Sequence, residues 1–453
     1  MQQLDKLGVE SQLLMKERYK NEIQNKMLKI IRNQDVRSIE FVEDFDISQL
    51  FIYDCKNMVP TLNNKQISYF HAQDCDMKSI EGLKLENLQV LCLFDNKIVQ
   101  TNTIRSFSQL RELNLGYNKN VDISPLQYMT GLTKLNLAAC NVNSAAPLKS
   151  LTNLEELELF INPLKDIAPL VYLRKLSKLN IGQCGLRKAK ELKDLNLSEL
   201  HLTANKGVDT AVLKNFKNLR ILHLNYCGLQ KIPEVSSLVN LQELVLSSNE
   251  KLNLEPVKNL TLLAKLKIDF CKIKSIAVLQ KLTRLEELDL SNNKEIRDFV
   301  LLQHLVRLKM LRIEQCDLRS VAMLLPLVNL QELSLGKNNI VRVNSLERLA
   351  SLRHLNVENN LIVDFSALKK HQNFGSFKIQ NQRQPSIAQV KQANAVSCID
   401  APVTLLRNMN LMKNKLKARK IIILNLLNKQ RNNAALAMQL VVAFIQQSNQ
   451  ASQ

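Results

Sequence analysis

The chain has 453 residues, enough for two or three ordinary domains, and 45% of them are hydrophobic, which permits an extensive core. Its ten glycines are few for this length and disfavour glycine-rich phosphate loops, while the net charge is +20. The amino terminus mixes charges with apolar residues, and the longest nearly apolar run, 434–445, is too short for a membrane helix of roughly 20 residues. We expect a protein of the cytoplasm or nucleus whose nine cysteines stay reduced.

The first segment, residues 1–35, is predicted to be an amino-terminal helical cap. Apolar residues within 11–32 recur near helical spacing, at Tyr19, Ile23, Met27 and Ile30. Residues 36–42 then have the composition of a first, irregular strand.

Residues 36–382 are dominated by a repeat. The pattern apolar-x-x-apolar-x-apolar-x-x-[Asn/Cys] recurs about sixteen times, mostly 22 residues apart. Its first position, called position one below, falls at Ile47, Ile67, Leu88, Leu110, Leu132, Leu154, Leu176, Leu197, Leu219, Leu241, Leu263, Leu285, Leu308, Leu330, Leu352 and Phe374.

Positions four and six of each repeat point to one side of a short strand, and stacked repeats can pair these strands while sharing one apolar core. Apolar residues spaced by three in the second half of each repeat favour 3₁₀ or short helical turns. The predicted fold class is an α/β solenoid in the form of a horseshoe or arc. It has a parallel β-ladder on the concave face, 3₁₀ or short helices on the convex face, and helical caps.

The string LQELSLGKNNIVRVNSLERLASL (Leu330–Leu352) resembles the leucine-rich repeat family, in the 22-residue subclass typified by the nuclear regulatory subunit of protein phosphatase 1. This resemblance implies a surface for binding proteins, and it makes a phosphatase catalytic subunit one candidate partner.

Position nine alternates between Cys and Asn from Asn118 to Asn338 and is predicted to be a structural turn ladder. Thiols two strands apart lie too far from each other for disulfides, and no cysteine pair has zinc-ligand spacing. Most Asn repeats of this run also have a turn one residue longer, which suggests that Asn bridges a wider turn than Cys. The ladder comprises Cys55, Cys75, Asn96, Asn118, Cys140, Asn162, Cys184, Asn205, Cys227, Asn249, Cys271, Asn293, Cys316, Asn338 and Asn360.

Positions three, five, seven and eight are expected on the solvent side of the ladder, which we call the ladder face. They carry fourteen carboxylates and seven basic side chains, and exposed aromatic residues gather in the first repeats. We predict a protein-binding patch there, with a covering amino-terminal helix as the alternative. The patch comprises Phe51, Tyr53, Asp54, Tyr69, Asp74, Phe94, Asp95, Tyr117, Glu156, Glu158 and Phe160.

Catalytic and cofactor motifs are not apparent. His201 and His223 occupy the same position in adjacent repeats, but their column neighbours Asn180 and Val245 are not further metal ligands, so an ordinary surface pair is favoured. We expect no enzyme activity, no cofactor, no metal and no small-molecule substrate.

Residues 383–453 form a basic carboxy-terminal segment with ten Lys or Arg and one acid. Apolar stripes at helical spacing within 405–427 and 434–445 predict helices that cap the array. A contact with nucleic acid or an anionic membrane is the alternative for this segment.

Together these features predict an intracellular scaffold or regulatory subunit that binds a protein through an acidic, aromatic concave surface. The alternative is a structural protein, or one that binds nucleic acid or membrane surfaces, acting through its basic convex face and tail.

Overall fold

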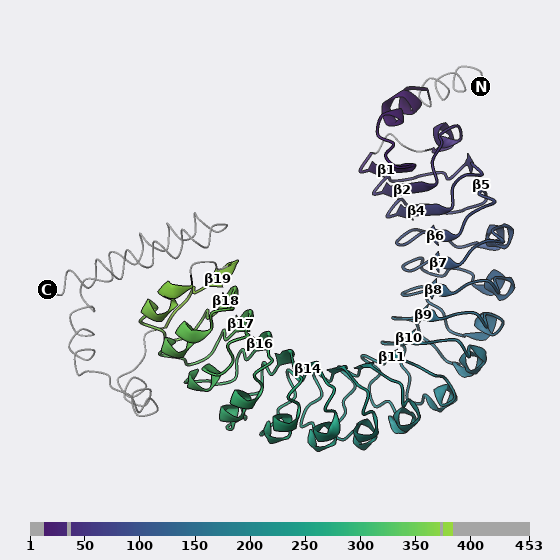
Figure 1. Ribbon diagram of the computed structural model, residues 1–453. Coiled ribbons are helices and arrows are strands. Elements are labelled where there is room, and N and C mark those ends of the chain that lie inside the picture. Colours follow the sequence, from purple (N-terminus) through teal and green to yellow (C-terminus); the bar gives the residue numbers. More distant parts are fainter. Residues whose placement is uncertain (1–12, 34–37, 372–374, 384–453) are drawn as a thin grey trace, which may run out of the picture. The chain divides into compact units, whose positions relative to one another are not determined.

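The computed structural model describes residues 13–33, 38–371 and 375–383 (Figure 1). The chain divides into two compact units, Met1–Cys227 and Gly228–Gln453, called here the first and second units. Each is built from the repeats located above.

In the first unit, the strands at positions three to five of each repeat pair in parallel and in register. They are β1 (Met27–Ile31), β2 (Gln49–Tyr53), β4 (Tyr69–Gln73), β6 (Val90–Cys92), β7 (Glu112–Asn114), β8 (Lys134–Asn136), β9 (Glu156–Glu158), β10 (Lys178–Asn180), β11 (Glu199–His201) and β12 (Ile221–His223).

The return segments of this unit are 3₁₀ helices, apart from the pair β3 (Leu62–Asn63) and β5 (Leu83–Lys84). The 3₁₀ helices are η1 (Glu40–Val42), η2 (Asn102–Ser106), η3 (Ser124–Tyr128), η4 (Ala146–Leu148), η5 (Ala168–Tyr172), η6 (Lys190–Leu192) and η7 (Ala211–Asn215).

The second unit repeats this arrangement. Its strands are β13 (Glu243–Val245), β14 (Lys265–Lys267), β15 (Glu287–Asp289), β16 (Met310–Arg312), β17 (Glu332–Ser334), β18 (His354–Asn356) and β19 (Ser376–Lys378). Its 3₁₀ helices are η8 (Pro233–Ser237), η9 (Glu255–Asn259), η10 (Ala277–Lys281), η11 (Phe299–His304), η12 (Ala322–Leu324), η13 (Asn344–Arg348) and η14 (Ser366–Lys370). The predicted solenoid fold, with a parallel ladder and 3₁₀ returns, is confirmed.

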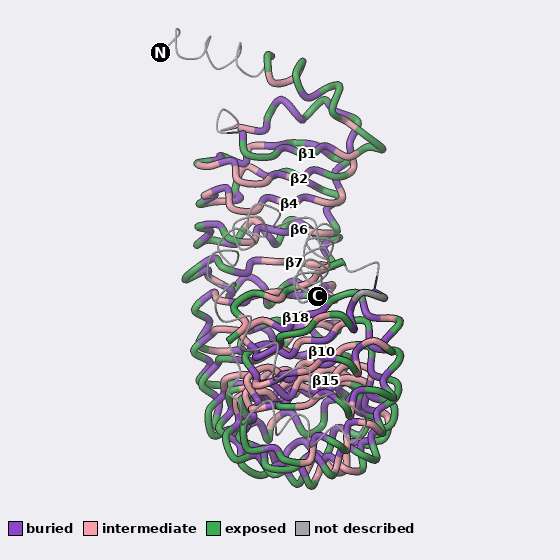
Figure 2. Tube along the Cα trace, turned by 90° about the vertical axis from the view of Figure 1, so that its left-hand side faces the viewer, coloured by how far each residue is buried: buried purple, intermediate pink, exposed green. Residues whose placement is uncertain are grey.

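The core of each unit lies between the ladder and the 3₁₀ helices. Leucines at positions four and six, such as Leu222 and Leu224, are completely buried, whereas the flanking positions three and five are partly exposed (Figure 2). Period-two burial in the strands and period-three burial in the returns therefore produce one continuous apolar layer per unit. Among the described residues, no helix has the length and apolarity needed to cross a membrane.

The amino-terminal end differs from the prediction. Residues 13–20 are helical, but 27–31, predicted as part of the same helix, form strand β1, which pairs with β2 along its whole length. The described part of the predicted strand 36–42 contains η1 instead. The helix packs Tyr19 against Phe41 at the end of the core, with ring centroids 5.7 Å apart.

At the other end, the degenerate last repeat still adds strand β19. Gln382 occupies position nine, and its amide bonds to Val357 O and Ile379 O at 2.8 and 3.0 Å. The predicted carboxy-terminal helices lie outside the described residues.

An asparagine at position nine connects its own repeat to the preceding one. Asn162 Oδ1 accepts hydrogen bonds from the backbone N–H groups of Cys140 and Val142 at 3.1 and 2.8 Å. Its Nδ2 donates to Leu137 O and Leu159 O, both at 2.8 Å. One side chain thus satisfies four buried backbone groups in two repeats.

A cysteine at position nine makes fewer of these bonds. The thiol of Cys184 donates toward Leu159 O at 3.1 Å and Gly182 O at 3.3 Å, and of the preceding turn it faces the backbone N–H of Asn162. The eight cysteines among the described residues are buried and free. Burial raises the pKa of Cys75 to about 12 and that of Cys184 to about 11.

Turn length follows position nine of the next repeat, and not that of the repeat that contains the turn. Before Asn118, the buried residue Ile98 stands two places after Asn96 and donates its N–H to Asn118 Oδ1. Before Cys140, the turn of Asn118 is one residue longer, and Val121 N–H bonds back to Asn118 O at 3.2 Å.

Cys55 shows which of the two repeats sets the turn length, because position nine is cysteine both in its own repeat and in the next one, at Cys75. Its turn is the longer one, and Met58 N–H bonds to Cys75 O at 3.1 Å. A thiol is a weaker acceptor for the turn amides than an asparagine carbonyl, so the preceding turn closes on backbone carbonyls and has an extra residue. The expectation that Asn itself requires the wider turn is therefore wrong. Asn162, followed by Pro163, is the exception, since it precedes Cys184 with a short turn.

We predict that Asn162→Ala lowers the free energy of unfolding by about 2–4 kcal/mol, because it leaves buried N–H and C=O groups without partners. Cys184→Ala, the matched control one repeat away, should cost about 1 kcal/mol. Urea denaturation followed by circular dichroism measures both. Equal losses would contradict the assignment of the bridging role to asparagine.

A second prediction concerns thiol reactivity. In a Cys398→Ser chain, which keeps only the eight described thiols, iodoacetamide at pH 8 should label native protein far more slowly than urea-unfolded protein. Burial keeps these thiols protonated and inaccessible. Mass spectrometry counts the labels, and rapid native labelling would show that the ladder cysteines are not held in the core.

Candidate interaction surface

The ladder face of the first unit begins with a cluster of four rings on strands β2 and β4. Phe51 lies 4.9 Å from Tyr69 between ring centroids, and Tyr53 lies 4.8 Å from His71. The Phe51 and Tyr53 rings are stacked at 6.5 Å, and Phe51 also faces His71 at 5.9 Å. All four are partly exposed. We call these residues the aromatic cluster.

His71 was not among the predicted site residues, although its place at position five of the second repeat puts it on the same face. Desolvation lowers its pKa below the usual value, so its imidazole is neutral at pH 7 and packs as an aromatic ring. The remaining predicted aromatic residues lie apart from this group. Phe94 and Tyr117 form their own pair at 4.9 Å, and Phe160 lies two repeats beyond Tyr117.

Strand β1 adds basic groups that the sequence did not place on this face. Lys29 Nζ lies 5.4 Å from the centroid of the Tyr53 ring, and Arg32 approaches Asp54 at 3.6 Å. In the helix of residues 13–20, the ring of Tyr19 contacts the buried ring of Phe41. Tyr19 therefore packs on the core.

Two of the three predicted aspartates share a lysine. Lys56 Nζ lies 3.5 Å from Asp54 and forms a shorter ion pair with Asp74. The bond to Asp74 is the main reason that the pKa of Lys56 is raised. Asp95 remains exposed. The local negative charge is thus smaller than the count of carboxylates suggests.

Position three forms a column of alternating charge. Strand register places Glu112, Lys134, Glu156, Lys178 and Glu199 side by side, and the Lys134–Glu112 and Lys178–Glu156 pairs measure 3.1 and 2.8 Å. These ion pairs join neighbouring strands and are exposed, so each adds little to the free energy of unfolding. The predicted residue Glu158 lies beside them at position five and is exposed.

A groove of about 500 Å³ runs along this surface. Its lining begins with Tyr69 and His71 of the aromatic cluster and continues past Glu112, Lys134 and Glu158 to His201. His201 and His223 are neighbours as predicted, with ring centroids 4.0 Å apart, and His201 Nε2 lies 2.7 Å from Glu199 Oε1. Among the described residues no three His, Cys, Asp or Glu side chains are placed to hold a metal ion.

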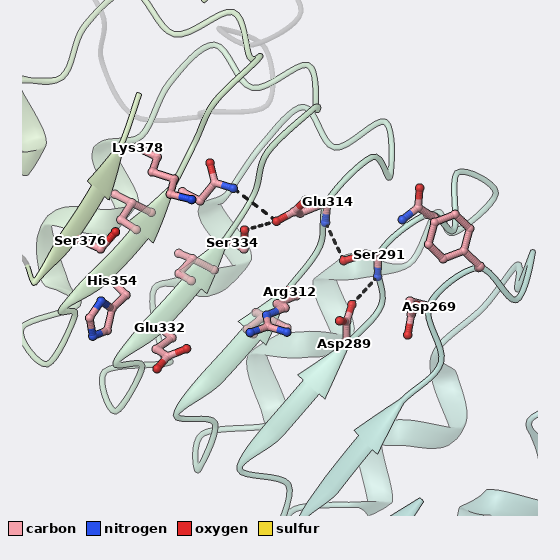
Figure 3. Close-up of a pocket in the computed structure, with 16 residues that line it drawn as sticks. Asp269, Asp289, Ser291, Arg312, Glu314, Glu332, Ser334, His354, Ser376 and Lys378 are labelled. Carbon is pink, nitrogen blue, oxygen red and sulfur yellow. Dashed lines mark hydrogen bonds between the residues drawn. The ribbon is translucent and has the colours of Figure 1, made fainter. Parts of the chain in front are cut away.

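The ladder face of the second unit holds a polar hollow of about 440 Å³ (Figure 3). Figure 3 shows Glu314 near its centre, bonded to Ser334 and, at 3.3 Å, to Asn356 Nδ2. Asp289 accepts a bond from Ser291 N–H at 3.0 Å. The carboxylates here are thus oriented by neighbouring strands rather than freely solvated.

Asp289 is a partly buried carboxylate at position five of its repeat, on the strand next to Arg312. Desolvation raises its pKa, although the backbone bond from Ser291 opposes the shift. In other repeats asparagine stands at this position and makes the same bond without a charge, as Asn180 does to Gly182 N–H at 3.0 Å. A desolvated carboxylate with a raised pKa in a hollow is a candidate for a binding site.

Comparisons with known proteins agree with this architecture. Residues 328–370 match the family model described as Leucine Rich repeats (2 copies). An internalin, InlF, from Listeria monocytogenes is 26% identical over 70% of this chain and 86% of its own, with a TM-score of 0.52. The chain thus has the leucine-rich-repeat fold.

Two further structures share the leucine-rich-repeat fold at lower identity. A leucine-rich-repeat protein from Leptospira interrogans is 21% identical over 74% of this chain and 90% of its own, with a TM-score of 0.53. TLR13, solved in complex with ssRNA13, is 19% identical over 81% of this chain and 67% of its own, with a TM-score of 0.51. No curated protein matches the chain. At these identities the likeness concerns the fold alone.

We predict that Asp289→Asn stabilises the leucine-rich-repeat chain at pH 7. The pKa of Asp289 in the folded state is raised above 3.8, so the protonated carboxyl favours the folded state. This contribution to the free energy of unfolding is fully present only below that pH and is lost as the pH rises. The gain in urea midpoint from Asp289→Asn should therefore be present at pH 7 and vanish near pH 3.5.

The control is Glu287→Gln, on the same strand, where the carboxylate lies 3.8 Å from Lys265. It should change stability by less than about 0.5 kcal/mol at either pH. Loss of stability in Asp289→Asn at pH 7 would show that the charge supports the fold.

Proposed function

We propose that this protein is a non-enzymatic scaffold or regulatory subunit that binds a protein partner through the ladder face of its first unit. The observation that carries the proposal is the aromatic cluster, four partly exposed rings within 4.8–6.5 Å of one another on two adjacent strands. Positions three and five further along the ladder are mostly Glu, Lys or Asn. Clustered exposed aromatic side chains are typical centres of binding energy in protein interfaces.

The groove beside the cluster supports the same site. It continues from Tyr69 and His71 past Glu112, Glu156 and Glu158, where a partner's basic groups would find carboxylates. Phe94, Tyr117 and Phe160 extend the apolar contact along the ladder. Aromatic burial supplies affinity, while the charged column fixes orientation.

The cell compartment and the partner follow as further parts of the proposal. Eight buried, free thiols fit the reducing cytoplasm or nucleus. A phosphatase catalytic subunit is one candidate partner, on the strength of the resemblance of Leu330–Leu352 to that regulatory subclass.

Nucleic-acid binding is the second candidate, favoured by the net charge of +20 and by the basic segment 383–453. TLR13, which shares the fold, was solved with ssRNA13. Binding to a phosphate backbone should weaken steeply with salt, whereas an aromatic-centred protein contact should persist.

The test uses affinity capture from cell extract with the full chain and with Tyr53→Ala plus Tyr69→Ala. We expect the double variant to capture at least about tenfold less of a specific protein partner, because each substitution removes one ring from the centre of the contact. Mass spectrometry quantifies the captured proteins, and circular dichroism checks the fold.

Tyr128→Ala plus Tyr172→Ala is the matched control. These tyrosines belong to 3₁₀ helices of the same unit and are 58% and 49% exposed. The control should retain the partner at both 50 and about 500 mM salt. Equal loss in both variants, or release of all partners by nuclease or salt, would reject the ladder face as the principal site.

A further inference from the structure

A second recess lies at the turn edge of the first unit, where position eight of each repeat leads into the turn. It is a hollow of about 820 Å³ formed where the turns of four consecutive repeats lie side by side, between Tyr117 and Gly185. Its apolar lining includes Tyr117, Ala139, Ile161 and Pro163. The proposed binding at the aromatic cluster makes no use of it.

Ile161 has a backbone conformation that its side chain disfavours. Its φ is +59°, in the left-handed region that position eight adopts throughout both units. Ile161 N–H is held by a bond to Gly182 O at 3.0 Å, so the stacking of repeats imposes this conformation. A β-branched residue there costs about 1–2 kcal/mol, whereas asparagine tolerates it and occupies the equivalent positions 292, 359 and 381.

Packing does not compensate for this strain, because Ile161 is only partly buried. Its exposed surface faces the hollow together with Pro163, and Tyr117 beside them is 45% exposed. A strained apolar residue displayed in an open recess points to a role in binding rather than in folding.

The rim of the hollow is basic. Lys119 and Lys165 line it, and no carboxylate is among its lining residues. Within the described part of the chain, neither lysine has an ion-pair partner within 4.0 Å. The charge is thus opposite to that of most charged side chains on the ladder face.

We infer that this hollow docks an acidic segment of a protein, which inserts one large apolar side chain against Ile161, Tyr117 and Pro163. Carboxylates flanking that side chain pair with Lys119 and Lys165. Tyr117 also extends the contact proposed for the ladder face, but the inference does not rest on that function, because Ile161, Pro163, Lys119 and Lys165 belong to this hollow alone and the partner charge is opposite.

The probe is a library of random twelve-residue peptides, panned on the immobilised full chain with counter-selection on the Ile161→Asn chain. We expect enrichment of peptides with a large apolar residue between Asp or Glu. For a fluorescein-labelled peptide of this class, Ile161→Asn should weaken binding at least about tenfold while leaving the thermal midpoint unchanged or higher. That combination distinguishes binding from a structural role, which would lower the midpoint.

Ala204→Asn is the matched control, since Ala204 has φ +58° at the same position of a later repeat and does not line the hollow. It should keep affinity within about twofold. The exposed pair Lys119→Glu with Lys165→Glu should weaken acidic peptides at least about tenfold without unfolding the chain. No enrichment, enrichment of basic peptides, or equal binding by Ile161→Asn would overturn the inference.

Discussion

The turn after each strand depends on a side chain that belongs to the following repeat. Asn162 shows the arrangement most fully, because its amide satisfies the amides of Cys140 and Val142 in one repeat and carbonyl groups in two. A single repeat therefore cannot complete its own hydrogen bonding, and stability comes from stacking. The same dependence explains the alternation of turn lengths. Where the next repeat offers a thiol in place of an amide carbonyl, the chain adds a residue and closes the turn on backbone carbonyls, as it does between Asn118 and Val121; the turn of Asn162 is the exception.

This fixed register converts the sequence into columns of side chains on the ladder face. One column alternates Glu and Lys so that neighbouring strands neutralise each other, which leaves little net charge for steering a partner. In the first repeats the corresponding positions carry rings instead, and these stack on each other in the open. The face is therefore differentiated along its length. Its aromatic end is suited to an apolar contact, and the charged stretch that follows is suited to setting orientation.

Two surface residues are less favourable for stability than residues found at the same position of other repeats. Asp289 keeps a desolvated charge where asparagine serves other repeats, and Ile161 keeps a strained backbone where asparagine also serves. In both cases a more stable residue is already used elsewhere in the same chain. Local choices that oppose stability while the surrounding repeat stays regular are expected at sites selected for binding. They also line separate hollows, one in each unit, and the charged side chains of these hollows differ in sign.

The sequence by itself determined the repeat boundaries, the inward leucines, the 3₁₀ returns and the side chains that face solvent, because periodic burial is a local property of the chain. The sequence pattern predicted a helix over 27–31, because Met27 and Ile30 fit helical spacing and Asn25 stands where the repeat usually has an apolar first residue. Asn33, at position nine, was the signal that these residues form another repeat. Only the tertiary structure decided how side chains from different repeats combine. It joined His71 to the aromatic cluster, placed Lys56 between Asp54 and Asp74, and assembled the hollow around Ile161. These groupings depend on strand register and turn conformation, which arise from contacts between repeats and are not encoded within any one of them.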